Sequence, residues 1–431
     1  MRNAQQLLAD LSAGRWDAAF ASLYGCAGRS AADCRARYAR LVEGFTAAFG
    51  DGEREFAFYS APGRTELGGN HTDHQHGRVL AASVDLDVIA LAAPNGTNTV
   101  RVLSEGFKMD VVDLARLTPV EEETNHSASL IRGVCAAFAA KGWPVQGFDA
   151  YTTSAVLKGS GLSSSAAFEV LIGNIANHLF AGGAETPVTI AQIGQYAENA
   201  YFGKPSGLMD QMGCSVGGFI TIDFQNPEKP IVEKVDFDFA HSGYKLCVVD
   251  TGGNHADLTG DYAAAPVEMR AVAEALGGKV LRDVAPETFY AALPALRGKC
   301  TDRALLRAFH FYADNDRVPR QVAALRAGDF EEFKRLVIES GRSSFMYLQN
   351  VYTCKNPDEQ GLSLALAMSE HLLAGRGAWR VHGGGFAGTI QAFVPEDLLD
   401  GYKAAMEAVF GANHCHVLSI RPVGGVDLCA L

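Results

Sequence analysis

A turn of glycine and serine residues leads directly into an alanine-rich segment at residues 157–169, which reads LKGSGLSSSAAFE. Gly159 and Gly161 allow the backbone to bend and approach a ligand closely, and the serines supply hydroxyl groups. The helix expected after the turn presents unpaired N–H groups, which favour a bound anion. Hydroxyls beside a phosphate also suit Mg²⁺. The segment predicts a phosphate-binding loop, with a plain helix N-cap as the alternative.

A second cluster of polar residues lies between glycines at residues 62–77, which read PGRTELGGNHTDHQHG. This composition is typical of a binding loop rather than of a core. Four of its residues are metal-ligand types: His71, Asp73, His74 and His76. A metal site is therefore one interpretation, although a second ligand cluster and an HExxH motif are absent from the sequence. A sugar site fits as well, because Asn, His and Asp side chains bind hydroxyls and Arg64 brings a permanent charge. A solvated turn without a ligand is the third interpretation.

A third cluster, ENAYFGKPSGLMDQ, spans residues 198–211. We expect Glu198 to lie on a helix and Asp210 to lie at the start of the next element. Asp210 is then either an N-cap or a carboxylate base beside a reacting hydroxyl, with Glu198 available to a metal ion.

Other nucleotide-binding signatures are absent from the sequence. It has no GxxxxGK[ST] and no HRD…DFG pair, which excludes a Walker-type loop and a protein kinase. The GGGF run at residues 383–386 lacks the strand, helix and downstream acid of a dinucleotide-binding fold. A nucleotide would therefore bind here through a different type of phosphate-binding loop.

The overall composition describes a globular protein with room for two cores. The chain has 431 residues, of which 48% are hydrophobic and 20% charged. Its net charge of −12 argues against a nucleic-acid partner. Nine cysteines without CxxC spacing favour reduced thiols and a cytoplasmic location. We expect no secretory signal and no membrane association.

Hydrophobic periodicity predicts a mixture of helices and strands without strict βαβ alternation, and hence an α+β fold. Helices are expected over 1–50, 127–141, 163–180, 189–201, 263–375 and 396–410, with breaks at Pro286, Pro319 and Pro357. Strands are expected over 55–59, 79–93, 100–103, 148–156, 219–224, 244–250, 378–394 and 416–421.

Four motifs in order resemble the galactokinase branch of the GHMP small-molecule kinases, from about Tyr38 to the C-terminus. The stretch GRTELGGNHTDH is similar to the family signature, typically GRVNLIGEHTDY, and GSGLSSSAA is similar to the phosphate loop. The segment AENAYFGKPSGLMDQ corresponds to the one that carries the family's catalytic aspartate. The stretch VHGGGFAGTIQAFVP corresponds to the third motif, usually GGGFGG, which packs behind the phosphate loop.

The resemblance implies the two-domain GHMP-kinase fold, with the active site in the cleft between the domains. We expect a helical N-terminal extension at 1–40, an α+β domain at 41–240 and a ferredoxin-like domain at 241–431. The activity implied is ATP- and Mg²⁺-dependent phosphorylation of the anomeric hydroxyl of galactose, which gives galactose 1-phosphate and ADP. The partners implied are the sugar and ATP, and we expect a monomer or weak dimer.

The resemblance also implies a role for each site residue. Asp210 would be the catalytic base and Arg64 its ionic partner beside the transferring phosphoryl group. Ser165 and Glu198 would bind Mg²⁺, and Ser104 would contact the nucleotide. The phosphates would lie against Gly159, Ser160, Gly161, Leu162, Ser163, Ser164 and Ser165. The sugar would contact Asn70, His71, Thr72, Asp73 and Tyr262.

Two departures from the family pattern concern the sugar. The family's usual Glu is Asn70 here, and its usual Tyr is His74. That Glu contacts the sugar at or near C6, so Asn70 is expected to remove a negative charge from the pocket. Uronate kinases of the superfamily also lack the Glu and carry a His-Gln pair like His74–Gln75. A galacturonate kinase is therefore one alternative, and a catalytically retired sugar sensor is another.

Overall fold

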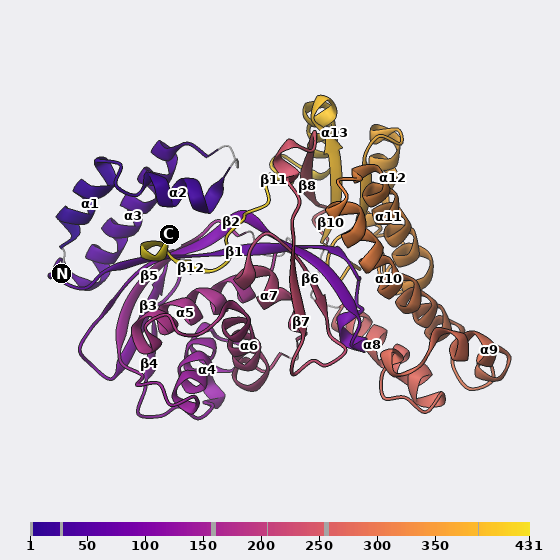
Figure 1. Ribbon diagram of the computed structural model, residues 1–431, viewed down its shortest axis with the longest axis horizontal. Helices are drawn as coiled ribbons and strands as arrows, with labels where there is room; N and C mark the ends of the chain where they lie inside the picture. Colours follow the sequence, from indigo (N-terminus) through magenta and orange to yellow (C-terminus); the bar gives the residue numbers. More distant parts are fainter. Residues whose placement is uncertain (1–2, 26–28, 157–160, 205, 254–257, 387) are drawn as a thin grey trace.

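The computed structural model describes residues 3–25, 29–156, 161–204, 206–253, 258–386 and 388–431. Within these ranges the chain forms two β-sheets with helices packed around them (Figure 1). The larger sheet has the order β12-β1-β2-β5-β3-β4, and β6 joins it through β2 and β7 through β6. The smaller sheet has the order β11-β8-β10-β9. This mixed arrangement agrees with the α+β prediction.

The strands of the larger sheet are β1 (Ala57–Gly68), β2 (Arg78–Pro94), β3 (Thr99–Ser104), β4 (Asp110–Asp113), β5 (Phe148–Ser154), β6 (Phe219–Asp223), β7 (Ile231–Val235) and β12 (Val426–Asp427). The smaller sheet consists of β8 (Tyr244–Asp250), β9 (Ala378–Val381), β10 (Thr389–Pro395) and β11 (Cys415–Leu418). The C-terminal strand β12 returns to pair with β1, so the end of the chain lies on the N-terminal sheet (Figure 1).

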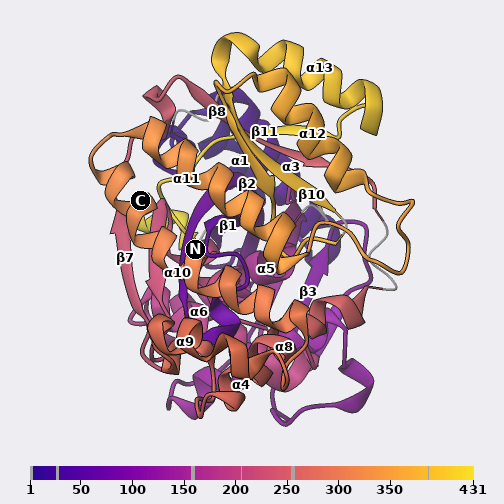
Figure 2. The ribbon, with the colours of Figure 1, turned by 90° about the vertical axis from the view of Figure 1, so that its right-hand side faces the viewer.

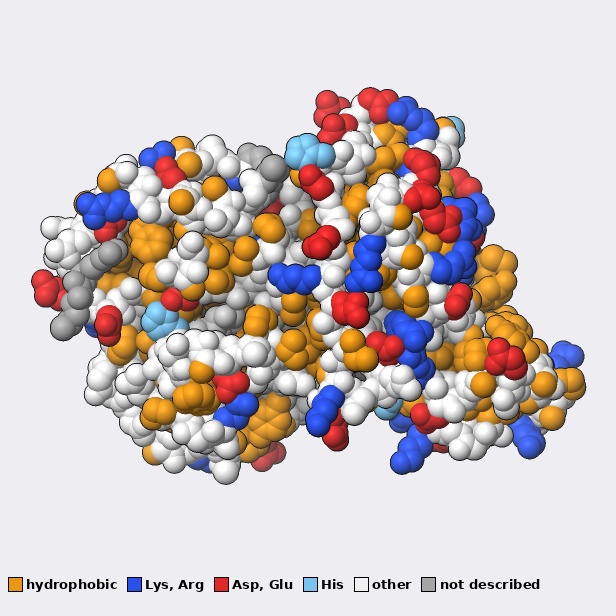
Figure 3. Space-filling model, in the orientation of Figure 1, with side chains coloured by type: hydrophobic (Ala, Val, Ile, Leu, Met, Phe, Trp, Pro, Cys, Tyr) orange, Lys and Arg blue, Asp and Glu red, His pale blue; other side chains and the backbone are white. Residues whose placement is uncertain are grey.

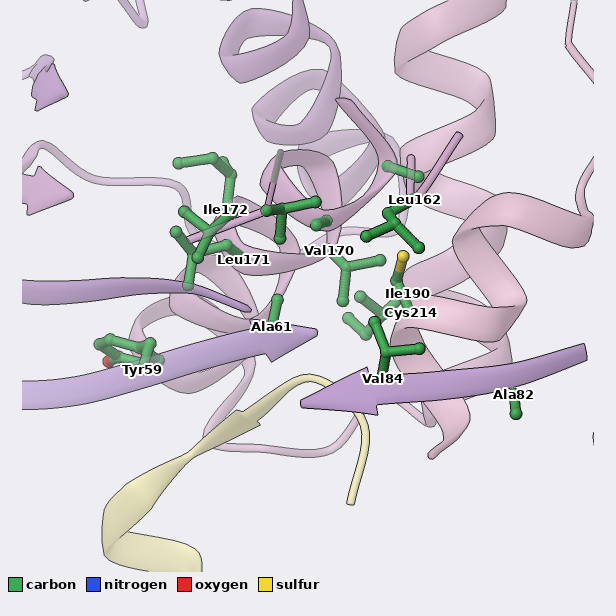
Figure 4. Packing of buried hydrophobic residues seen from close by; sticks show 14 of the residues in the cluster. Tyr59, Ala61, Ala82, Val84, Leu162, Val170, Leu171, Ile172, Ile190 and Cys214 are labelled. Carbon is green, nitrogen blue, oxygen red and sulfur yellow. The ribbon is translucent and has the colours of Figure 1, made fainter. Parts of the chain in front are cut away.

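The larger sheet is covered on both faces, which explains its long hydrophobic runs. One face carries α1 (Ala4–Ser12), α2 (Asp17–Tyr24) and α3 (Ala31–Phe49), which pack on Phe58 and Ile89. The adjacent residues Tyr59 and Ala90 point to the opposite face, as the alternation of a strand requires. Figure 4 shows the core on that side, where Ala61 of β1 lies near Val170 and Leu171 of α5 (Ser164–Ala181). The helices expected within residues 1–50 are thus confirmed.

The face of the sheet that carries α5 is also covered by α4 (Ser127–Ala140), α6 (Pro187–Ala197), the π-helix η3 (Glu198–Phe202) and α7 (Met209–Val216). The C-terminal helices are α8 (Thr259–Ala275), α9 (Pro286–Leu296), α10 (Asp302–Arg326), α11 (Phe330–Ser343), the π-helix η6 (Ser344–Leu348), α12 (Gly361–Leu373) and α13 (Leu399–Phe410). Figure 2 shows α10, α11 and α12 crossing in front of the smaller sheet. Short 3₁₀ turns complete the chain: η1 (Asp73–Gln75), η2 (Glu121–Glu123), η4 (Phe239–His241), η5 (Leu281–Asp283), η7 (Glu396–Leu398) and η8 (Leu428–Ala430).

Two sequence-based predictions about local structure are wrong. Pro319 does not break the helical region, because α10 continues through it over 25 residues. Proline removes a helix hydrogen bond and costs about 3 kcal/mol, and the burial of Val318 and Val322 beside it offsets this loss. The first half of the segment 62–77 is not a loop but part of β1, in which every residue is buried. Several polar side chains of that strand have partners from other elements, as Arg64 has in Asp210 and Glu66 has in Arg380.

The distribution of charge over the surface and the lengths of the helices can be described directly. Figure 3 shows acidic and basic side chains interspersed over one face of the molecule, without a continuous basic patch on that face. No helix in the described ranges is long and apolar enough to span a membrane.

Candidate active site

Arg64 and Asp210, which are distant in the sequence, form the central ion pair of the candidate site. Arg64 lies on β1, and its Nε and Nη2 atoms donate to Asp210 Oδ1 at 2.9 and 2.7 Å. Asp210 lies in the first turn of α7, whose N-cap residue is Leu208. The close approach requires Gly213, because a Cβ atom there would lie 2.7 Å from Arg64 Cβ. Asp210 is thus an ion-pair partner rather than an N-cap.

The electrostatic environment keeps Asp210 ionised. Burial raises the pKa of this carboxyl group, but the charge of Arg64 and hydrogen bonds from Ser163 and Arg64 outweigh burial and hold it below its ordinary value. The Asp210 side chain is nevertheless 31% exposed, so one edge of the carboxylate remains accessible. An ionised and accessible carboxylate can accept a proton.

The end of the serine loop is attached to this pair. Ser163 Oγ donates to Asp210 Oδ2 at 2.6 Å, and Arg64 Nη1 donates to the carbonyl oxygen of Gly161. The backbone N–H of Arg64 donates to the carbonyl oxygen of Leu162 at 3.1 Å. Ser163 has a positive φ of 58°, and α5 begins at Ser164 as expected for an anion-binding helix start.

Two residues that the resemblance assigns to the phosphates, Gly159 and Ser160, lie outside the described residues. Gly161, Leu162, Ser163, Ser164 and Ser165 are described and lie at the N-terminus of α5. Their contact with phosphate stays a prediction.

Ser165 and Glu198 lie side by side, with Ser165 Oγ 3.4 Å from Glu198 Oε1. Glu198 is the first residue of η3 and is buried. Its Oε1 also accepts from Lys204 Nζ at 2.7 Å, and its Oε2 accepts from Gln211 Nε2 at 2.9 Å. Two hard oxygen atoms so close together fit the donor set that Mg²⁺ prefers, with phosphate oxygens and water as further ligands. The residues therefore fit the metal that the resemblance implies.

The alternative metal site within residues 71–76 is not supported. Across the described ranges, no group of three or more His, Cys, Asp or Glu side chains is arranged to hold a metal ion. Gln75, which lies between His74 and His76 in the sequence, is buried and donates to the carbonyl oxygen of Pro266 at 3.2 Å. This segment is thus held by contacts with the C-terminal helices and not by a shared metal ion.

Three residues assigned to the sugar contact three consecutive carbonyl groups of the glycine cluster. Asn70 Nδ2 donates to the carbonyl oxygen of Gly383 at 2.8 Å, and His71 Nε2 lies 3.1 Å from that of Gly384. The hydroxyl of Tyr262 donates to the carbonyl oxygen of Gly385 at 2.7 Å. The glycine cluster therefore fixes these side chains relative to one another.

His71 offers a hydrogen-bond acceptor to a ligand. Burial and the neighbouring His74 lower the pKa of His71 to about 4, so the ring is neutral at pH 7. Because Nε2 faces a carbonyl oxygen, it carries the proton, and Nδ1 is left as an acceptor. Nδ1 is buried and has no hydrogen-bond partner among the described residues. A sugar hydroxyl is a suitable donor to it.

The resemblance implies that Asn70 contacts the sugar, but the structure surrounds its side chain with protein groups. Its side chain is fully buried. Nδ2 donates to Gly383 and, at 2.9 Å, to Glu66 Oε1, while Oδ1 accepts from Ser344 Oγ and Asn350 Nδ2 at 3.1 and 2.9 Å. All of its hydrogen-bonding positions are thus taken by protein groups. The carboxyl group of Glu66 also lies beside Asn70, so a carboxyl group is retained nearby.

The remaining predicted residues lie around this centre. Thr72 is buried and donates to the carbonyl oxygens of Gly69 and Arg78 at 2.8 and 2.6 Å, which gives it a structural contact. Asp73 closely approaches the segment before Asp210, because a Cβ atom at Gly207 would lie 2.2 Å from Asp73 Oδ2. Ser104 ends β3, and its Oγ accepts from Thr152 Oγ1 at 2.9 Å. Their contacts with ligands stay predictions.

Sequence reasoning missed several residues that support the site: Glu66, Lys204, Gln211, Ser344, Asn350 and Arg380. Glu66, Lys204 and Gln211 lie within or beside the recognised motifs, so their polarity was a usable signal. Arg380 is fully buried in β9, just before the glycine cluster, and a charged residue in a buried strand indicates an ion pair. No comparable feature of the sequence identifies Ser344 and Asn350 as part of the site.

Comparison with known proteins assigns the family. A family model of the galactokinase galactose-binding signature matches residues 43–94, and a model of the GHMP kinases N terminal domain matches residues 129–218. Galactokinase from Streptomyces coelicolor is 31% identical over 359 residues, which cover 82% of this chain and 88% of that protein. Galactokinase from Homo sapiens is 31% identical over 383 residues, which cover 86% of this chain and 92% of that protein.

Solved structures agree with the fold. The structure of Lactococcus lactis galactokinase complexed with galactose superposes with a TM-score of 0.78 at 23% identity, over 90% of this chain and 99% of that one. Mevalonate kinase from Methanococcus jannaschii gives a TM-score of 0.61 at 13% identity, over 86% and 99% of the two chains. The fold is thus that of the GHMP kinases, and the extended identity with curated relatives shows that this chain belongs to the galactokinase family.

Proposed function

We propose that this protein transfers the γ-phosphoryl group of ATP to the anomeric hydroxyl of galactose, and releases galactose 1-phosphate and ADP. The observation that carries the proposal is the contact of one carboxylate, Asp210, with both the arginine of the galactose signature and the serine loop. This contact joins the sugar segment and the phosphate segment at a single point. Membership of the galactokinase family supports the same reaction.

In the proposed reaction, Asp210 accepts the proton of the anomeric hydroxyl as the sugar oxygen attacks the γ-phosphorus. The low pKa of Asp210 keeps it ionised before the reaction. Arg64 holds the carboxylate in place through two hydrogen bonds and adds positive charge where the phosphoryl group is transferred. General-base catalysis of this kind contributes roughly 10²–10⁴ in rate.

Ser165 and Glu198 would hold Mg²⁺ in this proposal. The bound ion would neutralise charge on the phosphates. Lys204, whose ammonium group contacts Glu198, would hold that carboxylate in position beside Ser165. The loop backbone and the start of α5 would bind the phosphate oxygens.

The sugar is proposed to bind beside the glycine cluster, where His71 Nδ1 accepts a hydroxyl proton. Asp73, near Gly207, is the second group suited to sugar hydroxyls, because a carboxylate binds vicinal hydroxyls through two oxygens. Galactose is favoured over galacturonate because curated galactokinases are 31% identical to this chain over most of its length.

The experiment is a sugar panel with ATP and Mg²⁺ that scores ADP release. It compares galactose, galacturonate, glucose and mannose, and ³¹P NMR identifies the phosphorylated position. We expect the highest kcat/KM with galactose and a product phosphorylated at C1. Faster turnover of galacturonate, or a product phosphorylated elsewhere, would replace this proposal.

A cytoplasmic location completes the proposal. Eight cysteines are described, and all are free thiols. Free thiols are stable in a reducing compartment, where ATP is also supplied.

A further inference from the structure

Glu66 and Asn70 form a hydrogen-bonded pair at the wall of the candidate sugar site. Asn70 Nδ2 donates to Glu66 Oε1 at 2.9 Å, and the two residues lie four positions apart in the chain. Glu66 comes from β1, which also carries Arg64, whereas Asn70 lies just after the strand ends. Both are buried. The pair therefore connects the catalytic strand with the segment that bears His71.

The pair is held by elements from the other end of the chain. Arg380 of β9 is fully buried and donates from Nη2 to Glu66 Oε1 at 2.7 Å. Glu66 is the carboxylate with which this guanidinium forms an ion pair. The other terminal nitrogen of Arg380, Nη1, has no hydrogen-bond partner among the described residues. Asn70 is held by Ser344, Asn350 and the carbonyl oxygen of Gly383. Removing either member would leave a buried polar or charged group unsatisfied.

The sequence places the carboxylate and the amide in the reverse order to the family signature. In GRVNLIGEHTDY the amide precedes the carboxylate by four residues, whereas GRTELGGNHTDH has Glu66 first and Asn70 second. Either exchange alone changes the number of buried charges beside Arg380 by one. Made together, the two exchanges keep one carboxylate and one amide.

We propose that Glu66 and Asn70 are an inverted carboxyl–amide pair: Glu66 carries the carboxyl group that the family signature has at position 70, and Asn70 carries the amide of position 66. Both act as positioning residues for the sugar site, through the glycine cluster that contacts His71 and Tyr262. The inference rests on the proposed galactokinase activity for its kinetic readout. It also keeps galactose as the expected sugar, because the carboxyl group of the signature is displaced along the chain and not lost.

The test is a double-mutant cycle of Glu66→Asn, Asn70→Glu and the combined exchange. Each single variant should lower the melting temperature and reduce kcat/KM for galactose at least tenfold. Glu66→Asn leaves Arg380 without its carboxylate, and Asn70→Glu buries two adjacent carboxylates. The combined exchange should melt above both single variants and recover kcat/KM to within about fivefold of the wild type. A folded double variant no better than the worse single variant overturns the inference.

The melting temperatures test the pair even if galactose is not the substrate. A wild-type protein without galactose turnover would contradict the proposed function, whereas additive melting shifts would contradict the inverted pair. If the combined exchange does not fold, Glu66→Gln takes its place because it removes the carboxyl group and keeps the shape. It should raise the KM for galactose about tenfold and leave the KM for ATP unchanged. Unchanged KM values for both substrates overturn the inference.

Asp149→Asn is the matched control for loss of a buried carboxylate. Asp149 lies on β5, is fully buried and pairs with Arg54 and Arg101 at 2.6 and 2.7 Å, away from the sugar residues. This variant should lower the melting temperature but leave kcat/KM for galactose within about twofold of the wild type. If it reduces kcat/KM as strongly as Glu66→Asn, the effect at Glu66 is one of general stability, and the positioning role is contradicted.

Discussion

Arg64 donates two hydrogen bonds to one oxygen of Asp210, at 2.9 and 2.7 Å, and leaves the other oxygen to Ser163 at 2.6 Å. The guanidinium of Arg64 therefore fixes one oxygen of the carboxylate, and the hydroxyl of Ser163 fixes the other. A phosphoryl acceptor that approached Oδ2 would meet the same oxygen that Ser163 contacts. The arrangement orients Asp210 for proton transfer without neutralising it.

Asp210→Asn should abolish phosphoryl transfer and leave sugar binding largely intact. The amide has nearly the same shape but cannot accept the proton, and loss of a general base costs roughly 10²–10⁴ in rate. Stopped assays of ADP release measure turnover, and calorimetric titration with galactose measures binding. Normal turnover by a folded variant would show that Asp210 only holds Arg64 and Ser163 in place.

Ser165→Ala and Glu198→Gln should each raise the Mg²⁺ concentration needed for half-maximal activity far more than they raise the KM for galactose. Both supply hard oxygen atoms, 3.4 Å apart, and Mg²⁺ commonly uses few protein ligands together with substrate phosphates. Mg²⁺ titrations at saturating ATP and galactose measure the effect. Mg²⁺ curves that coincide with the wild type in both variants would remove these residues from the metal site.

The fold could be predicted where periodicity is strong and could not where contacts override local preference. The hydrophobic run at 79–93 gave β2 because both faces of that strand are covered. The two residues of β12 are too few to show a period, and their pairing with β1 is set by tertiary structure. Pro319 indicated a break, yet packing on both sides of it keeps α10 continuous.

The site could be predicted where its residues lie within recognised motifs. Arg64 and Asp210 belong to two such motifs, and the structure brings them together. The environment of Asn70 could not be predicted, because its partners Ser344 and Asn350 are more than 270 residues away in the sequence. Spacing along a chain gives no measure of such contacts. Only the three-dimensional structure therefore shows that every hydrogen-bonding group of the Asn70 side chain has a protein partner.

Glu66 should make the stability of the protein depend on pH between about 4.5 and 7. Burial raises the pKa of Glu66 to about 7, although Arg380 and Arg64 act against burial and Asp73 adds to it. The folded state then keeps a proton that the unfolded state releases, so the free energy of unfolding falls as pH rises through this window. The contribution lost is on the order of 3 kcal/mol.

Urea unfolding of the wild type and of Glu66→Gln at several pH values measures this contribution. The wild type should lose stability relative to Glu66→Gln as the pH rises from about 4.5 to 7, because the glutamine side chain of the variant cannot titrate. The comparison cancels other groups that titrate in the same window. A constant difference across the window would mean that Glu66 has the same pKa in the folded and unfolded states.

Tyr24 joins the N-terminal helices to a buried ion-pair network, and Tyr24→Phe should weaken that attachment. Its hydroxyl donates to Asp87 Oδ2 at 2.8 Å, and Asp87 is fully buried with Arg37 and Arg421 as ionic partners. A hydrogen bond to a charged group contributes about 1.5–3 kcal/mol. We expect the free energy of unfolding to fall by this amount, measured by urea unfolding, and kcat to remain unchanged.

Tyr290→Phe makes the same chemical change at a position that is 44% exposed, and it is the matched control. Exposed substitutions of this kind change stability by about 0.5 kcal/mol or less. Because Asp87 would keep its two arginine partners in Tyr24→Phe, the variant should still fold, which makes its unfolding midpoint measurable. If Tyr24→Phe and Tyr290→Phe unfold at the same urea concentration, the hydroxyl of Tyr24 contributes nothing to the attachment. The N-terminal helices would then be held by their other contacts, which include the Arg37–Asp87 ion pair and the hydrophobic contacts of Phe58 and Ile89.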